Sequence, residues 1–211
     1  FPYYNLETMQ KLHEADAEVA DVGDDVFGED PTVRRLEERM ASLLGKEAGL
    51  LVSSGTMGNL VALLAHAGRG DEVIIGDRSH TFLYEVGGSA GLGGIHPHPL
   101  ATAADGTLDL GDIEASIRDP SNIHFPRTRI VCLENTHNRC GGIALAPEYG
   151  DEVRALADRY GLLVHLDGAR LFNAATACNV EPVRLARCAD TVTICLSKGL
   201  GAPVGSVLCG D

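Results

Sequence analysis

Short apolar runs that alternate with helical patterns constrain the fold of this chain more than any other feature. Five such runs predict buried strands, at residues 49–53, 72–75, 129–133, 162–166 and 191–196. Apolar residues at helical spacing follow Pro31, the turn that begins at Ser54, and Pro147. Strands that are apolar throughout are typical of parallel sheets covered by helices on both faces. We therefore expect an α/β fold, with a mostly parallel sheet and helices on both faces.

One more apolar run, residues 204–209, lies near the end of the chain. The loop before it is too short for the crossover that joins two neighbouring parallel strands. We therefore expect this strand to run antiparallel to its neighbour. Ligands of open α/β sheets bind beyond the carboxyl ends of the strands, so functional residues are expected there.

The charge of the chain excludes some classes of partner. Seventeen Lys and Arg stand against 30 Asp and Glu, which gives a net charge of −13. This excess of acidic residues argues against a broad surface for nucleic acid or for an anionic membrane. No apolar run approaches the roughly 20 residues of a membrane-spanning helix. We expect a small-molecule partner, with no nucleic acid and no membrane.

The cysteines and histidines do not form a metal-site pattern. None of the six cysteines is spaced as a C-x-x-C pair. The pair His96 and His98 lacks a third ligand at useful spacing, so no metal is expected. Several cysteines lie in apolar runs, which favours buried thiols in a reducing compartment. We expect a cytoplasmic protein. The alternative is an organellar targeting segment removed before Phe1.

The turn Ser53-Ser54-Gly55-Thr56-Met57-Gly58-Asn59 lies between a predicted strand and a predicted helix. Its glycines allow the backbone to approach a ligand closely. Free amides and the helix dipole attract phosphate at such a position, and Ser54 and Thr56 add hydroxyl donors. The turn is therefore a candidate phosphate site; the alternative is a tight turn with an ordinary helix cap.

A second candidate is the sequence Asp167-Gly168-Ala169-Arg170, at the end of the strand at 162–166. A carboxylate at this position can hold a cation or a protonated ring nitrogen, and the small residues after it leave room for a flat ligand. Arg170 can bind a carboxylate through its guanidinium group. The alternative is a helix cap by Asp167 and a surface position for Arg170.

Lys198 is the third candidate. The chain has only three lysines, and Lys198 alone follows an apolar strand and precedes a glycine-rich turn. A partly desolvated lysine amine is a nucleophile toward carbonyl groups, which is the chemistry of Schiff-base enzymes. The alternative is a side chain that reaches past the turn to solvent.

The histidines differ in their relation to the predicted strands. His80 and His137 each follow a strand, His124 precedes one, and His165 lies within one, where a core position is expected. Imidazole titrates near neutral pH, so a histidine at the end of a strand is a candidate general base.

Together, the three candidates match what pyridoxal phosphate needs. The turn at 54–59 would hold the phosphate, and Asp167 would keep the ring nitrogen protonated. Lys198 would form the Schiff base with the aldehyde. The sequence therefore predicts a pyridoxal-phosphate enzyme.

The chain also resembles a known family. The stretches that carry the resemblance are Gly23–Thr32, Ser54–Asn59, Asp77–His80, Leu133–Asn138, His165–Asn173 and Cys195–Ser206. They are similar to those of the threonine aldolases, pyridoxal-phosphate enzymes of the aspartate aminotransferase (type I) fold. The resemblance implies a cofactor-binding large domain over residues 22–211, after an irregular or helical segment over residues 1–21. We expect that large domain to be truncated at its C-terminal end, without the family's small domain.

The resemblance also implies roles for matching residues around the cofactor. Lys198 matches the Schiff-base lysine, and Asp167 matches the partner of the ring nitrogen. His80 matches the residue that stacks on one face of the ring, with Ala169 on the other face. The other residues expected at the cofactor are Ser54, Gly55, Thr56, Arg170 and Ser197.

For the substrate, the resemblance implies retro-aldol cleavage of L-threonine, L-allo-threonine and related β-hydroxy-α-amino acids to glycine and an aldehyde. Arg170 matches a residue that binds the substrate carboxylate, and His124 matches a second histidine near the substrate side chain. His80 or His124 is the expected base. Members of the family act as homodimers or homotetramers.

Three alternatives stay open at this point. The chain could be another type I pyridoxal-phosphate lyase, β-eliminating or decarboxylating, or an inactive fragment that keeps the cofactor domain. A serine hydrolase is the third alternative, because Gly87-Gly88-Ser89-Ala90-Gly91 matches the pattern of a nucleophile elbow. The glycines and prolines that follow argue against the helix that such an elbow needs.

Overall fold

The structure is a computed structural model that describes residues 23–24 and 27–211; the segment predicted over residues 1–21 lies outside them. The strands of the described residues are β1 (Ala48–Val52), β2 (Asp71–Gly76), β3 (His96–Leu100), β4 (Arg127–Glu134), β5 (Leu163–Asp167), β6 (Thr191–Cys195) and β7 (Ser206–Gly210). The helices are α2 (Pro31–Leu44), α3 (Gly55–His66), α4 (His80–Leu83), α5 (Gly88–Gly91), α6 (Leu110–Ser116), α7 (Pro147–Tyr160), α8 (Leu171–Cys178) and α9 (Pro182–Ala186). No helix among these described residues is long and apolar enough to cross a membrane.

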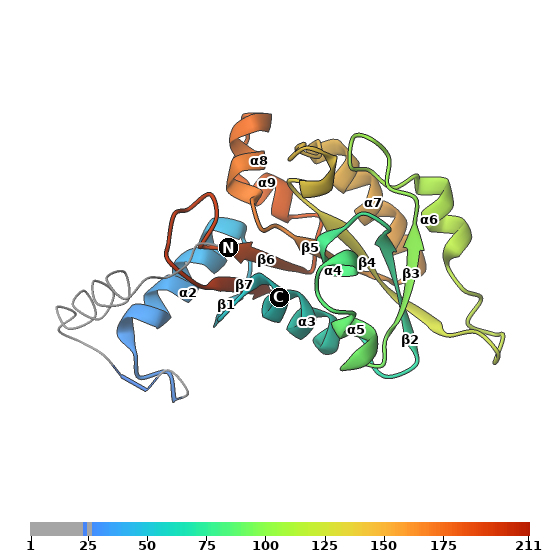
Figure 1. The fold of residues 1–211 in the computed structure, drawn as a ribbon, viewed down its shortest axis with the longest axis horizontal. Helices are drawn as coiled ribbons and strands as arrows, with labels where there is room; N and C mark the ends of the chain where they lie inside the picture. The colour runs from blue at the N-terminus through green and yellow to red at the C-terminus, as the bar shows by residue number, and fades with distance from the viewer. Residues whose placement is uncertain (1–22, 25–26) are drawn as a thin grey trace.

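The strands form one sheet in the order β1-β7-β6-β5-β4-β2-β3 (Figure 1). The pairs from β6 to β3 are parallel, and β7 runs antiparallel to both β1 and β6. The predicted mostly parallel sheet and the antiparallel last strand are therefore confirmed. The observed bounds of the strands differ from the predicted ones by at most two residues.

Alternating side chains of the sheet are buried in two apolar layers, because successive residues of a strand point to opposite faces. On β2, Val73 and Ile75 belong to the layer that holds Leu63 of α3. Ile74, between them, belongs to the layer that holds Val153 of α7. The same alternation continues on β4. Helices on both faces thus explain why these strands are apolar throughout.

The face beneath α3 becomes polar on the two central strands β5 and β6. His165, Asp167, Thr191 and Thr193 lie there, and all four are buried. The opposite side chains of the same strands are apolar and lie in the layer of α7. Burying polar side chains is unfavourable unless they are hydrogen-bonded. Helix α3 therefore has to bring polar partners to this part of the sheet.

The first long helix begins at Pro31, as expected, and side-chain and backbone caps define both of its ends. The carboxylate of Asp30 accepts hydrogen bonds from the backbone N–H of Thr32 and of Val33, at 2.8 and 3.0 Å. Pro31 occupies the first turn, where its missing N–H costs nothing. Gly45 ends α2 in the left-handed conformation, with φ 66°.

Strand β3 was not predicted, and its sequence His96-Pro97-His98-Pro99 contains two prolines, which are rare inside a sheet. In the structure it forms the edge of the sheet and pairs with β2. Proline is tolerated on an edge strand, where one row of N–H groups needs no partner in the sheet. The edge position therefore explains how a segment with two prolines can form a strand.

Ser89 does not lie in a nucleophile elbow. It belongs to α5, a single turn of helix that follows α4 and its connecting loop. An elbow requires a strand directly before the serine. The serine hydrolase alternative is therefore not supported by the fold.

Gly58 shows how closely α3 packs on the sheet. A Cβ at this position would lie 2.8 Å from Thr193 Cγ2, well inside the 3.5–4.0 Å at which carbon atoms pack best. Alanine normally favours a helix by about 1 kcal/mol over glycine. We expect the overlap to outweigh this gain, so that Gly58→Ala lowers the free energy of unfolding by roughly 1–3 kcal/mol.

Urea denaturation of the purified variants measures this effect. Gly91→Ala in α5 is the control, because a Cβ at Gly91 meets no atom within 4 Å. Equal stability of the Gly58→Ala variant and the parent chain would contradict the close packing of α3.

Candidate active site

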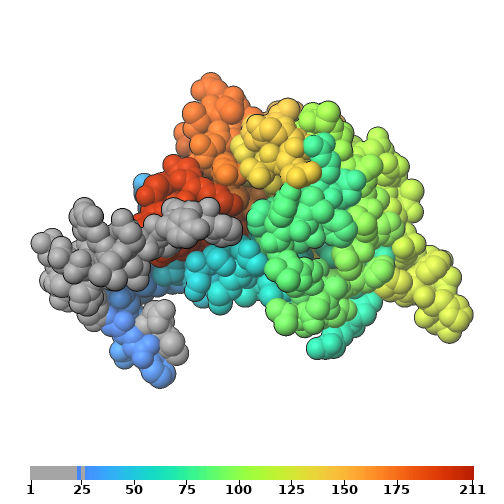
Figure 2. Space-filling view, in the orientation of Figure 1, coloured from blue at the N-terminus to red at the C-terminus, as the bar shows by residue number. Residues whose placement is uncertain are grey.

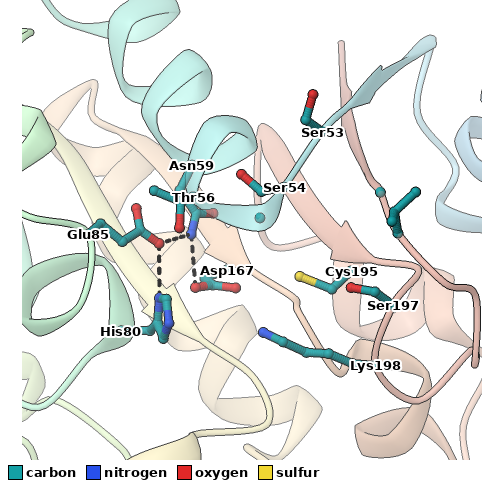
Figure 3. Close-up of a pocket in the computed structure, with 13 residues that line it drawn as sticks. Ser53, Ser54, Thr56, Asn59, His80, Glu85, Asp167, Cys195, Ser197 and Lys198 are labelled. Carbon is teal, nitrogen blue, oxygen red and sulfur yellow. Dashed lines mark hydrogen bonds and ion pairs between the residues drawn. The ribbon is translucent and has the colours of Figure 1, made fainter. Parts of the chain in front are cut away.

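A cavity of about 440 Å³ lies where β5 and β6 end and α3 begins. This is the carboxyl edge of the parallel strands, as expected from the fold. The predicted site residues that line the cavity are Ser54, Gly55, Thr56, His80, Asp167, Ser197 and Lys198. Residues from four separate parts of the sequence thus meet in one cavity (Figure 3).

Asp167 is the last residue of β5, and its side chain is buried. Its Oδ2 accepts a hydrogen bond from Asn59 Nδ2 at 3.0 Å, and its Oδ1 accepts one from the backbone N–H of Ala169 at 3.1 Å. Each oxygen of this carboxylate therefore has a donor, and the two hydrogen bonds fix its orientation.

Lys198 follows β6 and is partly buried. Figure 3 shows its side chain extending into the cavity toward Asp167 and His80. Its positive charge lowers the pKa of His80, as expected for a lysine that lies close to that ring. By contrast, the amine of Lys46 donates hydrogen bonds to the carbonyl of Ala189 and to the carboxylate of Asp211. Lys198 is thus the lysine of the described residues that reaches the cavity.

The start of α3 forms another wall of the cavity. Ser54 caps the helix, and its Oγ accepts a hydrogen bond from the backbone N–H of Met57 at 3.2 Å. The first amides of a helix have no partner within the helix and carry its positive dipole end. A Cβ at Gly55 would lie 2.7 Å from Cys195 Sγ, so glycine is required there.

His80 is held at two points. Its Nδ1 lies 3.0 Å from Glu85 Oε1, and its backbone N–H donates to Glu134 Oε2 at 2.6 Å. The hydrogen bond with Glu85 raises the pKa of His80 above the usual 6.5, against the opposing effect of partial burial. Because Nδ1 faces Glu85, Nε2 is the ring nitrogen left to exchange a proton with a ligand.

Glu134, at the end of β4, holds two loops at the rim of the cavity. Its carboxylate accepts hydrogen bonds from the backbone N–H of His80 and of Asn138. Asn138 in turn accepts a hydrogen bond from the guanidinium group of Arg170 at 3.1 Å. Burial raises the pKa of Glu134, and the neighbouring charge of Asp167 raises it further.

Three residues of this site were missed by sequence reasoning: Asn59, Glu85 and Glu134. Asn59 belongs to the glycine-rich turn but had no assigned role, and Glu134 lies in the Leu133–Asn138 stretch. Glu85 lies in the loop after α4 and has no signal in the sequence. All three are buried polar residues, and burial of this kind is visible only in the structure.

Three predicted site residues do not line the cavity. Ala169 and Arg170 lie just outside it, on the loop after Asp167. His124 is exposed and precedes β4, at the opposite edge of the sheet from the cavity. Figure 2 shows this yellow segment projecting at the edge of the molecule. The expected contribution of His124 is therefore not made within the cavity of the same chain.

The ligand atoms of His80, Glu85 and Asp167 lie within 4.8 Å of one another, as in a metal site. However, Asn59 Nδ2 donates to Glu85 Oε1 at 2.8 Å and to Asp167 Oδ2 at 3.0 Å. The amide group thus supplies the positive partner that brings these two carboxylates together.

The pKa of His80 gives a prediction that needs no ligand. We expect Glu85→Gln to lower this pKa, because the variant removes the negative charge beside Nδ1. The control is Glu148→Gln on the exposed surface of α7. An NMR titration of the His80 ring measures both variants, and an unchanged midpoint in Glu85→Gln would contradict the assignment.

The hydrogen-bonded pair of His80 and Glu85 also makes a pH-dependent contribution to the free energy of unfolding. The pKa of His80 is higher in the folded chain than the usual 6.5 of an unfolded chain. The contribution is therefore fully present below pH 6.5 and is lost as the pH rises through the raised pKa. The loss is expected to be smaller in Glu85→Gln.

Comparison with known proteins agrees with the fold and the cavity. The profile of the beta-eliminating lyase family matches residues 7–211. Low-specificity L-threonine aldolase 1 of Arabidopsis thaliana is 55% identical over 194 residues, which are 91% of this chain and 54% of the relative. Low specificity L-threonine aldolase of Escherichia coli (strain K12) is 50% identical over 192 residues, which are 91% of this chain and 56% of the relative.

The chain thus spans about half the length of these curated relatives. A crystal structure of a candidate L-allo-threonine aldolase from Listeria monocytogenes has a TM-score of 0.81 and 27% identity, and covers 96% of this chain and 55% of that one. The expected fold and the resemblance to threonine aldolases are confirmed. This chain belongs to the beta-eliminating lyase family.

Proposed function

We propose that this chain is the cofactor-binding part of a pyridoxal-phosphate-dependent aldolase. Its substrates would be L-threonine, L-allo-threonine and related β-hydroxy-α-amino acids, and its products glycine and an aldehyde. One observation carries the proposal: Lys198, Asp167 and the start of α3 line a single cavity of about 440 Å³. Ligand sites for small organic molecules commonly have this size.

The residues of the cavity fit the chemical groups of pyridoxal phosphate. The amides at the start of α3 suit the phosphate, and the absent side chain of Gly55 lets the backbone come close. The Ser206 hydroxyl is buried without a hydrogen-bond partner in the described part of the chain. It lies 3.8 Å from the position of a Cβ on Gly55. Asp167 suits a protonated ring nitrogen, and Lys198 suits the aldehyde.

When bound, pyridoxal phosphate supplies a ring that accepts the electrons released as a bond to the amino acid's α-carbon breaks. Lys198 would hold the aldehyde carbon through Nζ until an amino acid displaces it. Asp167 would keep a proton on the ring nitrogen. The hydroxyls of Thr56 and Ser197 would help to hold the phosphate. Each of these roles uses an atom that faces the cavity.

His80 is the base that the geometry of one chain favours. Its Nδ1–H donates to Glu85, which leaves Nε2 to take the proton from the β-hydroxyl of the substrate. Removal of that proton starts the cleavage between the α- and β-carbons. His80 must be neutral to act in this way, so activity is expected to rise with pH through its raised pKa.

The relatives support the choice of an aldolase among the reactions of this family. Those with 55% and 50% identity are named low-specificity L-threonine aldolases. The family profile carries the name of β-eliminating lyases, which keeps β-elimination as the second candidate reaction. An inactive fragment is the third, because the chain matches about half of each relative.

We also propose that the protein acts as a homodimer or homotetramer. An apolar surface on the neighbouring helices α3 and α5 and the loop between α4 and α5 supports this proposal. Its exposed side chains are Met57, Leu64, Val86 and Leu92. Apolar surfaces of this kind are typical of interfaces between proteins. Light scattering on the purified chain tests the proposal, and a mass of 22.3 kDa would contradict it.

A cytoplasmic location is a further proposal. The six cysteines are all free thiols in the structure, and four of them are buried. Free thiols are typical of reducing compartments. Imaging of the tagged protein in its own cells tests this, and an oxidising compartment would contradict it.

Replacement of Lys198 tests the cofactor site. We expect the purified chain to gain a visible absorption band with pyridoxal phosphate, and borohydride to fix the cofactor to Lys198, as found by peptide mapping. The Lys198→Ala variant should show neither result. The control Lys46→Arg should keep both, because Lys46 lies away from the cavity and contacts Asp211. Labelling of a different lysine would overturn the assignment.

Product analysis separates the candidate reactions. With L-threonine, an aldolase gives glycine and acetaldehyde, whereas a β-eliminating enzyme gives an oxo acid and ammonia, and a decarboxylase releases carbon dioxide. We expect glycine and acetaldehyde in equal amounts. Cofactor binding with no turnover of L-threonine or L-allo-threonine would instead establish the inactive fragment.

A further inference from the structure

A continuous line of hydrogen bonds connects the far end of α3 to the cavity, and it is buried except at His66, which is half-buried. Asn59 is its centre, and its side chain is 1% exposed. We call this line the relay; its members, in order, are His66, Thr191, His165, Asn59 and the carboxylates of Asp167 and Glu85. The contacts between successive members are 3.0, 3.0, 3.0, 3.0 and 2.8 Å. The relay runs between α3 and the polar strip of the sheet, the name we give to the buried polar residues His165, Asp167, Thr191 and Thr193 of β5 and β6.

The chemistry of the carboxylates fixes the orientation of Asn59. An ionised carboxylate only accepts hydrogen bonds, so the atom of Asn59 that faces Asp167 and Glu85 must be the amide nitrogen. Each of its two N–H groups then has a carboxylate partner. The amide oxygen consequently faces His165 Nε2, at 3.0 Å.

The direction of the remaining hydrogen bonds follows from this orientation. Because an amide oxygen only accepts, His165 must carry its proton on Nε2. Complete burial lowers the pKa of His165 to about 4, so the ring is neutral at neutral pH and Nδ1 has no proton. Nδ1 therefore accepts from the hydroxyl of Thr191.

The last contact closes the relay at the end of α3. Since the hydroxyl proton of Thr191 is directed at His165, its oxygen accepts from Nε2 of His66. Every hydrogen bond of the relay thus points from His66 toward the cavity. No member can reverse its direction without leaving two donors or two acceptors facing each other.

We propose that Asn59 is a positioning residue that holds Asp167 and Glu85, and that the relay behind it locks its amide in this orientation. Through Asp167 it would orient the carboxylate that faces the cofactor ring nitrogen. Through Glu85 it would orient His80. The functional part rests on the proposed function, whereas the direction of the hydrogen bonds does not.

Asn59 offsets the repulsion between neighbouring carboxylates of this cavity. Asp167 lies beside the carboxylates of Glu85 and Glu134, and like charges at such short range repel. Two amide N–H groups placed between Asp167 and Glu85 offset this repulsion and keep both side chains in one position. Thr81 Oγ1 lies 3.3 Å from the same nitrogen, but both N–H groups already have a closer partner.

The tautomer of His165 tests the relay without any cofactor. Nitrogen–proton correlation spectra of the labelled chain at pH 7 should show a neutral ring with its proton on Nε2. In Thr191→Val, which keeps the shape but removes the hydroxyl donor, the proton should stay on Nε2 because the amide oxygen of Asn59 still requires it, and the Nδ1 resonance should shift because Nδ1 has lost its donor. A ring of His165 with its proton on Nδ1, or a charged ring, in the parent chain would overturn the relay.

Cofactor binding tests the function of Asn59. Asn59→Asp keeps the shape but replaces the amide donors with oxygen atoms that face two carboxylates. We expect its Kd for pyridoxal phosphate to rise at least tenfold and its bound absorption band to shift. Asn59→Ala, which also removes both donors and adds no charge, serves if Asn59→Asp does not fold. Thr81→Val is the matched control and should bind as the parent chain does.

The outcomes separate this proposal from the proposed function. If the parent chain binds no pyridoxal phosphate, the proposed function is wrong, and the tautomer of His165 still decides the relay. If the parent chain binds and Asn59→Asp binds equally well, the positioning role of Asn59 is wrong and the proposed function stands. An equal loss in Thr81→Val would also overturn the role of Asn59.

Discussion

The hydrogen bond from Asn59 to Asp167 is the contact on which the rest of the cavity depends. It joins the beginning of α3 to the end of β5. The nitrogen of Asn59 and the oxygen of Asp167 are 3.0 Å apart, and both residues are buried. A buried carboxylate without such a donor is strongly unfavourable. The second N–H of Asn59 holds Glu85, and Glu85 holds His80. One amide group therefore fixes the positions of three side chains around the candidate cofactor site.

The sheet explains why these side chains meet. Parallel strands end at the same edge, so Asp167 after β5 and Lys198 after β6 come together although 31 positions separate them in the sequence. The buried polar residues of β5 and β6 then need hydrogen-bond partners, and α3 supplies them to Asp167 and His165 through Asn59 and to Thr191 through His66. The same helix presents its positive end to the cavity. The contacts that pack α3 on the sheet are thus the same contacts that position the side chains of the site.

The sequence was sufficient to predict features that depend on local patterns. Apolar runs identify the strands, and the ends of those strands identify Asp167 and Lys198. Strand β3 was not predicted, since Pro97 and Pro99 are tolerated only at the edge of a sheet, and the edge position is known only when the whole sheet is seen. The partners Asn59 and Glu85 were also missed, since their value lies in contacts with residues 108 and 26 positions apart along the chain.

The role of His124 near the substrate stays a prediction. The resemblance implied a role near the substrate, but the structure places this residue before β4, away from the end of the strand that meets the cavity. His165 is a different case. It was expected in the core, and it is fully buried, yet its two ring nitrogens contact Asn59 and Thr191. A core histidine in a polar strip therefore has a directional role that burial alone does not indicate.

A crystal structure of the chain grown with pyridoxal phosphate tests the central claim most directly. The account predicts continuous electron density between Lys198 Nζ and the cofactor, with the ring nitrogen within hydrogen-bond distance of Asp167 and the phosphate at the amides of Gly55 and Thr56. Cofactor bound at another lysine, or turned so that its phosphate faces Asp167, would contradict it.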